Sequence, residues 1–142
     1  MVMPIQRISP NSQHARGLEE VHQWLVEFAQ AVRARDVEKG RSLFAPDVVG
    51  FGTRTAHMAG LDALVEQQWK PIWNSTHGFS FQFDDVHAAI DGDIAWAAAP
   101  WTSWGIANDG KNFQRLGRAT YVLQRRGGKW LAVHSHHSLN PA

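Results

Sequence analysis

Three turn-forming dipeptides divide the second half of this 142-residue chain at regular intervals. Asp91-Gly92, Asp109-Gly110 and Gly127-Gly128 recur every 18 residues and separate runs rich in aromatic and β-branched side chains. Because such dipeptides favour tight turns between antiparallel strands, we predict a meander of four long strands at residues 79–90, 94–106, 113–126 and 129–139. Strands of about 12 residues extend roughly 40 Å. A domain of this size cannot hold them flat, so the sheet must twist and curl.

Pro100 lies inside the second of these predicted strands. Proline has no N–H to donate to a strand ladder, so it predicts a bulge or an edge segment at that position. The sheet could bend at Pro100.

The first half of the chain has the periodicity of helices. Apolar residues between Leu18 and Val32 recur at three- and four-residue spacing, which predicts an amphipathic helix. Asp36 suits the N-cap of a short second helix that ends before Pro46, and residues 48–51 are expected to form a strand. A broad apolar face over residues 60–74 predicts a third helix, in which Pro71 indicates a kink or an early end.

Helices followed by a curled meander indicate a single α+β domain. We expect a strongly bent antiparallel sheet whose concave face is capped by helices, an arrangement that encloses a pocket. We assign residues 17–142 to this domain. Residues 1–16 are polar, contain two prolines and show no sustained periodicity, so we predict a flexible N-terminal arm.

Composition excludes several classes of function. The chain has no cysteine, which rules out disulfides, thiolate metal ligands and a cysteine nucleophile. A formal charge of +1 offers no broad attraction for a polyanion, so no nucleic-acid partner is expected. No secretory signal and no apolar run of about 20 residues is found, which predicts a soluble cytoplasmic protein without a membrane span. The seven tryptophans require a large core or a lined cavity.

Several local phrases are shared with a known family. They are Leu43-Phe44-Ala45-Pro46-Asp47, the Gly60 that opens the third helix, Gly92-Asp93-Ile94-Ala95-Trp96, and Gly128-Lys129-Trp130 leading to residues 133–138. With the order of elements from Leu18 to Leu139, they make the chain resemble the SnoaL-like domains of the nuclear transport factor two-like superfamily. The resemblance implies a cone-shaped, antiparallel or mixed sheet with about three helices on its concave face, an internal cavity, and homodimers through the outer face of the sheet. Members include isomerases, cyclases, dehydratases and scaffolding domains, so the family does not fix an activity.

The catalytic positions of the ketosteroid isomerases, compared one by one, are not retained. The oxyanion-binding tyrosine falls at Phe28, the carboxylate base at Gly52, and the second acidic donor near Thr120. A phenyl ring cannot donate a hydrogen bond and glycine cannot carry a proton, so that mechanism is disfavoured.

The last predicted strand carries the strongest candidates for chemistry. Strict alternation places His134 and His136 on one face with Trp130, toward the pocket, and His137 on the opposite face. Two imidazoles at this spacing could act as a general acid with its orienting partner, as donors to a carbonyl, as paired metal ligands, or as hydrogen-bonded histidines without a chemical role. We name His134 and His136 as candidate catalytic residues and predict no cofactor. A metal would need a third ligand, for which His57 is the candidate.

Aromatic side chains and one arginine are predicted to bind the ligand. Core packing is the competing interpretation for the tryptophans, and a surface or dimer-face position is the competing one for the arginine. The predicted ligand-binding residues are Trp24, Phe28, His57, Trp69, Trp73, Trp101, Arg118 and Trp130.

The leading hypothesis is therefore a domain that binds a small hydrophobic or ring-containing molecule, with isomerase, cyclase or dehydratase activity at His134 or His136 left open. One alternative is a non-enzymatic homodimeric module, joined through an outer face that includes Leu131, Val133 and Leu139. A histidine metal site is the other alternative.

Overall fold

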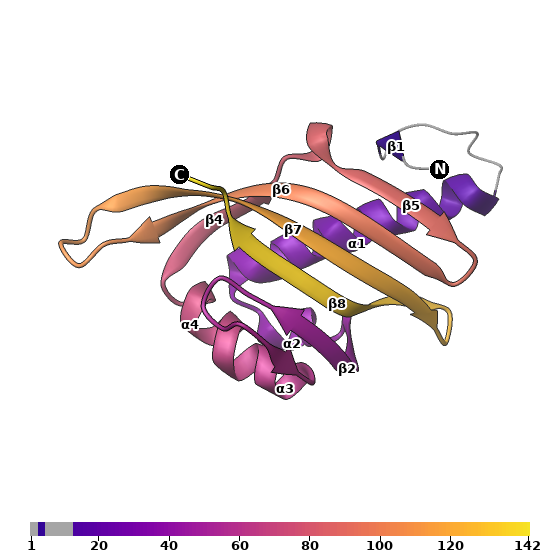
Figure 1. Ribbon diagram of the computed structural model, residues 1–142, viewed down its shortest axis with the longest axis horizontal. Helices are drawn as coiled ribbons and strands as arrows, with labels where there is room; N and C mark the ends of the chain where they lie inside the picture. Colours follow the sequence, from indigo (N-terminus) through magenta and orange to yellow (C-terminus); the bar gives the residue numbers. More distant parts are fainter. Residues whose placement is uncertain (1–2, 5–12) are drawn as a thin grey trace.

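A strongly curved sheet packs against a layer of helices in the computed structural model, which describes residues 3–4 and 13–142 (Figure 1). The strands are β1 (Met3–Pro4), β2 (Phe44–Phe51), β3 (Met58–Ala59), β4 (Thr76–Phe81), β5 (His87–Asp91), β6 (Ile94–Ile106), β7 (Asn112–Arg126) and β8 (Lys129–Leu139). The helical segments are α1 (Gln13–Ala34), α2 (Val37–Arg41), α3 (Leu61–Leu64), the π-helical η1 (Val65–Trp69), α4 (Lys70–Trp73) and the 3₁₀ turn η2 (Phe83–Asp85). This confirms the predicted α+β class and the helices-first order.

The sheet is mixed. Its strand order is β1-β5-β6-β7-β8-β2-β3, and β4 pairs with β6 off that path. The pairing of β2 with β8 is parallel and the other pairings are antiparallel. The β5–β6, β6–β7 and β7–β8 hairpins turn at the dipeptides that predicted them, with Gly92, Gly110, Gly127 and Gly128 all at positive φ.

Helix α1 crosses the concave face of the sheet (Figure 1) and supplies one side of the core. Its apolar stripe is buried, and each side chain of the stripe is at most 8% exposed: Leu18, Val21, Leu25, Phe28 and Val32. Burial of one such side chain stabilises the fold by about 1.5–3 kcal/mol. The helix already begins at Gln13, and Ala15 is buried. Helix α1 thus begins within the stretch over which the flexible arm was predicted, residues 1–16.

Two further residues of the predicted arm belong to the described part of the chain. Met3–Pro4 pair with Ala88 and His87 of β5. Residues 1–2 and 5–12, over which a flexible arm was also predicted, lie outside the described residues.

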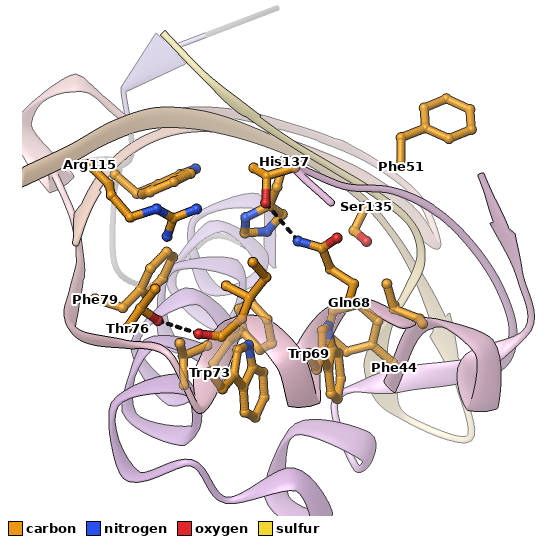
Figure 2. A pocket seen from close by; sticks show the side chains of 16 residues that line it. Phe44, Phe51, Gln68, Trp69, Trp73, Thr76, Phe79, Arg115, Ser135 and His137 are labelled. Carbon is orange, nitrogen blue, oxygen red and sulfur yellow. Dashed lines mark hydrogen bonds between the residues drawn. The ribbon is translucent and has the colours of Figure 1, made fainter. Parts of the chain in front are cut away.

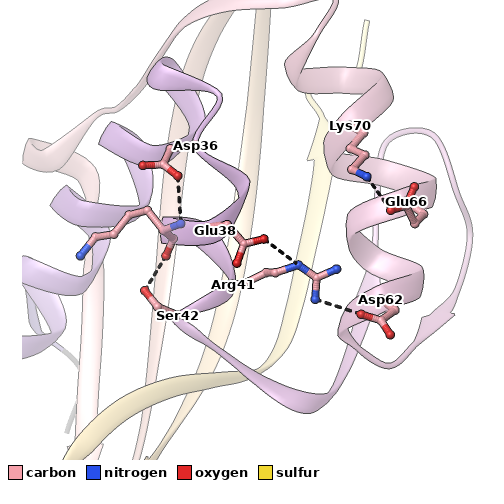
Figure 3. Close-up of polar contacts among 8 residues, drawn as sticks. Asp36, Glu38, Arg41, Ser42, Asp62, Glu66 and Lys70 are labelled. Atoms are coloured by element: carbon pink, nitrogen blue, oxygen red, sulfur yellow. Dashed lines mark hydrogen bonds and ion pairs between the residues drawn. The ribbon is translucent and has the colours of Figure 1, made fainter.

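Polar contacts fix the short helix α2 between α1 and α3 (Figure 3). The Asp36 carboxylate caps α2 by accepting from the Lys39 N–H at 3.1 Å, as predicted. Arg41 pairs with Asp62 of α3 at 2.9 Å. Because the Asp62 side chain is exposed, this pair adds at most about 1 kcal/mol, and it serves mainly to orient the two helices.

The predicted strand over residues 79–90 is broken into two. Strand β4 pairs with the end of β6, the η2 turn follows, and β5 pairs with the beginning of β6. Pro100 lies opposite the gap, where its carbonyl accepts from the Gln82 N–H at 2.9 Å. The proline thus sits at a local edge that needs no donor, as its chemistry predicted.

The third predicted helix runs from Leu61 to Trp73 and contains a π-helical turn. The Lys70 N–H bonds to the Val65 carbonyl, five residues back. Pro71 cannot donate to the Gln67 carbonyl, and the Thr55 hydroxyl donates to that carbonyl instead, at 3.2 Å. The extra residue in the turn allows the neighbours Gln68 and Trp69 both to face inward, where both are buried.

A β-bulge in β8 reverses the predicted facing of the histidines. His134 pairs with Val122 and Ala132 pairs with Leu123, so Val133 has no partner in β7. One extra residue shifts the alternation of side chains by one position. Trp130 and Ala132 still face the core, but beyond the bulge Ser135 and His137 face inward. The prediction that His134 and His136 face the pocket and His137 faces outward is wrong for this reason.

None of the helices in the described ranges is both long enough and apolar enough to cross a membrane.

Candidate functional site

A pocket opens between the helical layer and the concave face of the sheet (Figure 2). Its walls are mostly aromatic and include Phe28, Trp69, Trp73, Phe79 and Trp101. The cavity inside has a volume of about 40 Å³, and about 550 Å³ is reached when the open mouth and the spaces between side chains are counted. The smaller figure describes the room for a ligand in this conformation, which is about three water molecules.

The polar side chains of the pocket gather on the sheet side. Arg115 and His137 lie across the pocket from Trp69 and Trp73, and Gln68 and Ser135 lie beside His137 (Figure 2). Among the described residues that line this pocket, none is an Asp or a Glu.

His137 is held by the buried Tyr121 hydroxyl, at 2.5 Å from its Nε2. Aromatic rings surround the pair, and within residues 13–142 the hydroxyl has no other hydrogen-bond partner. Burial raises the pKa of Tyr121 well above its ordinary value, so the phenol keeps its proton. A buried hydroxyl needs an acceptor, and Nε2 is the acceptor at hand. We therefore assign the Tyr121 O–H as donor, which places the proton of a neutral His137 on Nδ1.

Burial also keeps His137 neutral. The pKa of this imidazole is lowered from 6.5 to about 3, mainly by burial and to a smaller extent by electrostatic interaction with His136 and Arg115. At neutral pH His137 is therefore a hydrogen-bond donor at Nδ1 and a very weak base.

Arg115 is a half-buried cation. Its Nη1 donates to Ser103 Oγ at 3.2 Å, and its guanidinium lies 5.3 Å from the centre of the Trp101 ring. Burial lowers its pKa. No carboxylate of the described residues lies within ion-pairing distance of it.

Trp101 packs closely against Gly117 of β7, where an added Cβ would overlap its ring. The residue is only 2% exposed, and its indole N–H has no partner among the described residues. An unpartnered buried donor is costly, so this N–H is notable in a pocket wall.

Gln68 closes the pocket near the loop after β2. Its Oε1 accepts from the Arg54 N–H at 3.0 Å, and its Nε2 donates to Thr53 Oγ1 at 2.9 Å. A Cβ at Gly52 would overlap the Gln68 amide. The amide thus fills the space in which a larger residue at position 52 would lie.

Four of the residues predicted to bind the ligand line the pocket: Phe28, Trp69, Trp73 and Trp101. Two others belong to the core. Trp24 donates from Nε1 to the Leu43 carbonyl at 2.9 Å, and Trp130 donates to Glu20 at 3.1 Å.

Arg118 and His57 lie outside the pocket. Arg118 is on the outer face of the sheet, where its Nε donates to Ser138 Oγ at 3.1 Å. This is the surface position that was weighed against binding. His57 is exposed in the loop between β2 and β3.

His57, His134 and His136 gather around the ring of Phe51 on the outside of the pocket, with ring centres 4.9–6.1 Å from it. His134 is fixed by the Val49 carbonyl, 2.8 Å from its Nδ1. The three imidazoles contact a phenyl ring and do not converge on one point. In the described ranges no set of three His, Cys, Asp or Glu side chains could hold a metal ion.

Sequence reasoning missed Arg115, Gln68 and His137 as pocket residues, and it missed Tyr121 as the partner that holds His137. For Arg115 a signal existed, since it shares strand parity with the buried Ala119, Tyr121 and Leu123. For His137 and Gln68 no local pattern reveals the bulge or the π-helical turn that directs them inward.

Comparison with known proteins adds the family. Residues 21–142 match the SnoaL-like domain. The chain belongs to this family. The SnoaL-like chain also resembles solved structures of the nuclear transport factor 2-like (NTF2-like) superfamily, which confirms the fold. No curated protein matches it.

Three of these structures show the degree of likeness. A candidate dehydratase of the NTF2-like family from Streptomyces avermitilis has a TM-score of 0.79 and 21% identity, covering 92% of this chain and all (100%) of its own. An NTF2-like superfamily protein from Salmonella enterica has a TM-score of 0.76 and 19% identity over 87% of this chain and 91% of that one. An NTF2-like protein of unknown function from Pseudomonas putida has a TM-score of 0.69 and 27% identity over 84% of each chain.

Proposed function

We propose that this SnoaL-like domain binds a small ring-containing molecule in the aromatic pocket. The observation that carries the proposal is the wall itself: Trp69 and Trp73 stack at 4.7 Å on one side, and Trp101 and Phe79 approach to 5.5 Å on the other. Aromatic walls with a few polar groups at one end are typical of small-molecule sites. Because the cavity is small, a bound ring needs side chains at the mouth, such as the exposed Phe51, to move outward.

Binding is favoured over acid–base catalysis as the role of the pocket. His134 and His136, the candidate catalytic residues, point away from it. His137 points into it, but its lowered pKa makes it a poor proton acceptor near neutral pH. A proton-abstracting isomerase or dehydratase would need a base that the described lining residues do not supply.

The indole N–H signals of the seven tryptophans give a test in which binding is measured on the unmutated protein. We would assign these signals by single Trp→Phe substitutions and titrate the ¹⁵N-labelled protein with benzamide and with benzoate. Binding in the pocket shifts the signals of Trp69, Trp73 and Trp101 and leaves those of Trp104, on the outer face, and Trp24, in the core, unchanged. Absence of any such shift with both probes at millimolar concentration, or shifts confined to Trp104, would contradict the proposal.

We also propose that two copies associate through the outer face of the sheet. Trp104 and Leu116 are diagonal neighbours on β6 and β7 there, and they are 41% and 45% exposed. Adjacent large apolar side chains on a sheet face favour a protein partner. Multi-angle light scattering at increasing protein concentration is the test. A protein that stays monomeric at about 100 µM, or a Leu116→Lys variant with unchanged association, would rule out this interface.

A further inference from the structure

Three polar groups of the pocket are donors. Arg115 is a cation, the Trp101 indole can only donate, and neutral His137 presents its Nδ1–H. The other polar lining groups are neutral: the Gln68 amide, whose Oε1 already accepts from the Arg54 N–H, and three hydroxyls, each of which can donate as well as accept. The sheet side of the pocket is therefore rich in donors and lacks an anion.

The charge of Arg115 is not balanced inside the fold. Partly buried cations are normally paired with a carboxylate, because removing a charge from water is costly. Within the described part of the chain, the guanidinium contacts only a hydroxyl and an indole face. Several of its N–H groups remain available, and the side chain points into the pocket (Figure 2).

The indole N–H of Trp101 is a second and independent sign. The residue is 2% exposed and lines the pocket, and its donor has no acceptor among the residues that the structure describes. A ligand oxygen would satisfy this donor and remove a penalty of desolvation that the free protein carries.

The Tyr121–His137 pair supplies the third donor. Because Tyr121 donates to Nε2, the imidazole proton is fixed on Nδ1, the ring nitrogen that has no partner in the described residues. The His137 ring lies 6.0 Å from the ring of Trp101, and Trp101 in turn contacts Arg115. The three donors thus lie next to one another on one side of the pocket.

We propose that this side binds the carboxylate of a ring-containing organic acid, with Arg115, Trp101 and His137 as donors to its oxygens. This inference rests on the proposed ligand pocket and names the class of its ligand. A carboxylate has three heavy atoms, which matches a cavity with room for about three waters. The ring of the acid lies against Trp69, Trp73 and Phe79, and the carboxylate supplies the negative charge that Arg115 lacks.

Benzoate and benzamide test the inference, because they have nearly the same shape and differ in charge. We would measure both affinities by calorimetry at pH 7.5 and low salt. Benzoate is expected to bind at least tenfold more tightly than benzamide. Arg115→Gln should weaken benzoate binding about tenfold to a hundredfold and leave benzamide binding nearly unchanged. Arg115→Lys keeps the charge without the planar fork and should lie between the two.

Arg118→Gln is the matched control, since it removes the same charge from the same strand on the opposite face. It should leave the preference for benzoate intact. Equal affinity for the two probes, or a benzoate preference that survives in Arg115→Gln or is lost equally in Arg118→Gln, overturns the carboxylate assignment while the pocket stands. Failure of both probes to bind and to shift the pocket indoles overturns the pocket itself. Circular dichroism on each variant confirms that a loss of binding is not a loss of fold.

Discussion

Replacing Gly52 by alanine would test how tightly the Gln68 amide is built into the pocket wall. The added Cβ would overlap this amide, whereas the backbone at position 52 has no positive φ that would strain an alanine. The side chain must then move away and lose its bonds to the Arg54 N–H and the Thr53 hydroxyl. Each bond stabilises the fold by about 1 kcal/mol. Alanine also lowers the conformational entropy of the unfolded chain, which stabilises the fold by about 0.5 kcal/mol. We expect Gly52→Ala to destabilise the fold by about 1.5 kcal/mol.

A double-mutant cycle separates this effect from a general intolerance of alanine. Gln68→Ala loses the same two hydrogen bonds and about one buried methylene, which together amount to about 3 kcal/mol. In Gly52→Ala/Gln68→Ala the bonds are lost only once, so we expect about 2.5 kcal/mol in place of the additive 4.5 kcal/mol. The coupling of about 2 kcal/mol would be measured by urea unfolding followed by circular dichroism, with an unchanged m-value.

Gln67 offers the matched control for the cycle, because its side chain is exposed one position earlier on the same helix. Gly52→Ala and Gln67→Ala should be additive within about 0.5 kcal/mol. If Gly52→Ala and Gln68→Ala were equally additive, or if Gly52→Ala were neutral, the Gln68 amide would not occupy the space at Gly52 and the reasoning would fail.

Three further changes have expected outcomes. The pKa of His137 is about 3 in the fold, so between about pH 6.5 and pH 3 only the unfolded chain takes up the proton. The free energy of unfolding should therefore fall as the pH drops through this range, by up to about 1.4 kcal/mol per pH unit. Urea unfolding at pH 7 and pH 5 should show this loss, and His137→Gln should reduce it. Gly117→Ala forces a Cβ into the Trp101 ring and should cost about 3 kcal/mol, seen as a lower melting temperature; an unchanged one would contradict the packing. Thr55→Val removes the donor to the Gln67 carbonyl that Pro71 leaves free and should cost about 0.5–1 kcal/mol in urea unfolding, an effect that should vanish if position 71 is also changed to alanine.

The sequence by itself determined the architecture. The turn dipeptides placed the hairpins, because tight turns between antiparallel strands favour residues at positive φ, which glycine adopts without strain. The apolar stripe from Leu18 to Val32 placed the long helix, and the prolines at positions 71 and 100 marked interruptions of the third helix and of the second long strand, where the backbone lacks a donor. These signals are local in the chain.

Tertiary structure alone decided which side chains face the pocket. The unpaired residue Val133 turns His137 toward the pocket and His134 and His136 away from it. The extra residue in the π-helical turn lets Gln68 face the pocket together with its neighbour Trp69. The side of the sheet that each residue of the last strand faces was predicted from strict alternation. An extra residue in a strand shifts that alternation by one position, and an extra residue in a helical turn shifts the helical periodicity in the same way. Whether the last strand gains such a residue depends on the packing of β8 between β7 and β2, which no stretch of sequence records. The aromatic side chains of the pocket, Trp101 among them, were therefore evident in the chain, and Arg115 left a signal in the strand parity. The inward direction of His137 was visible only in the fold.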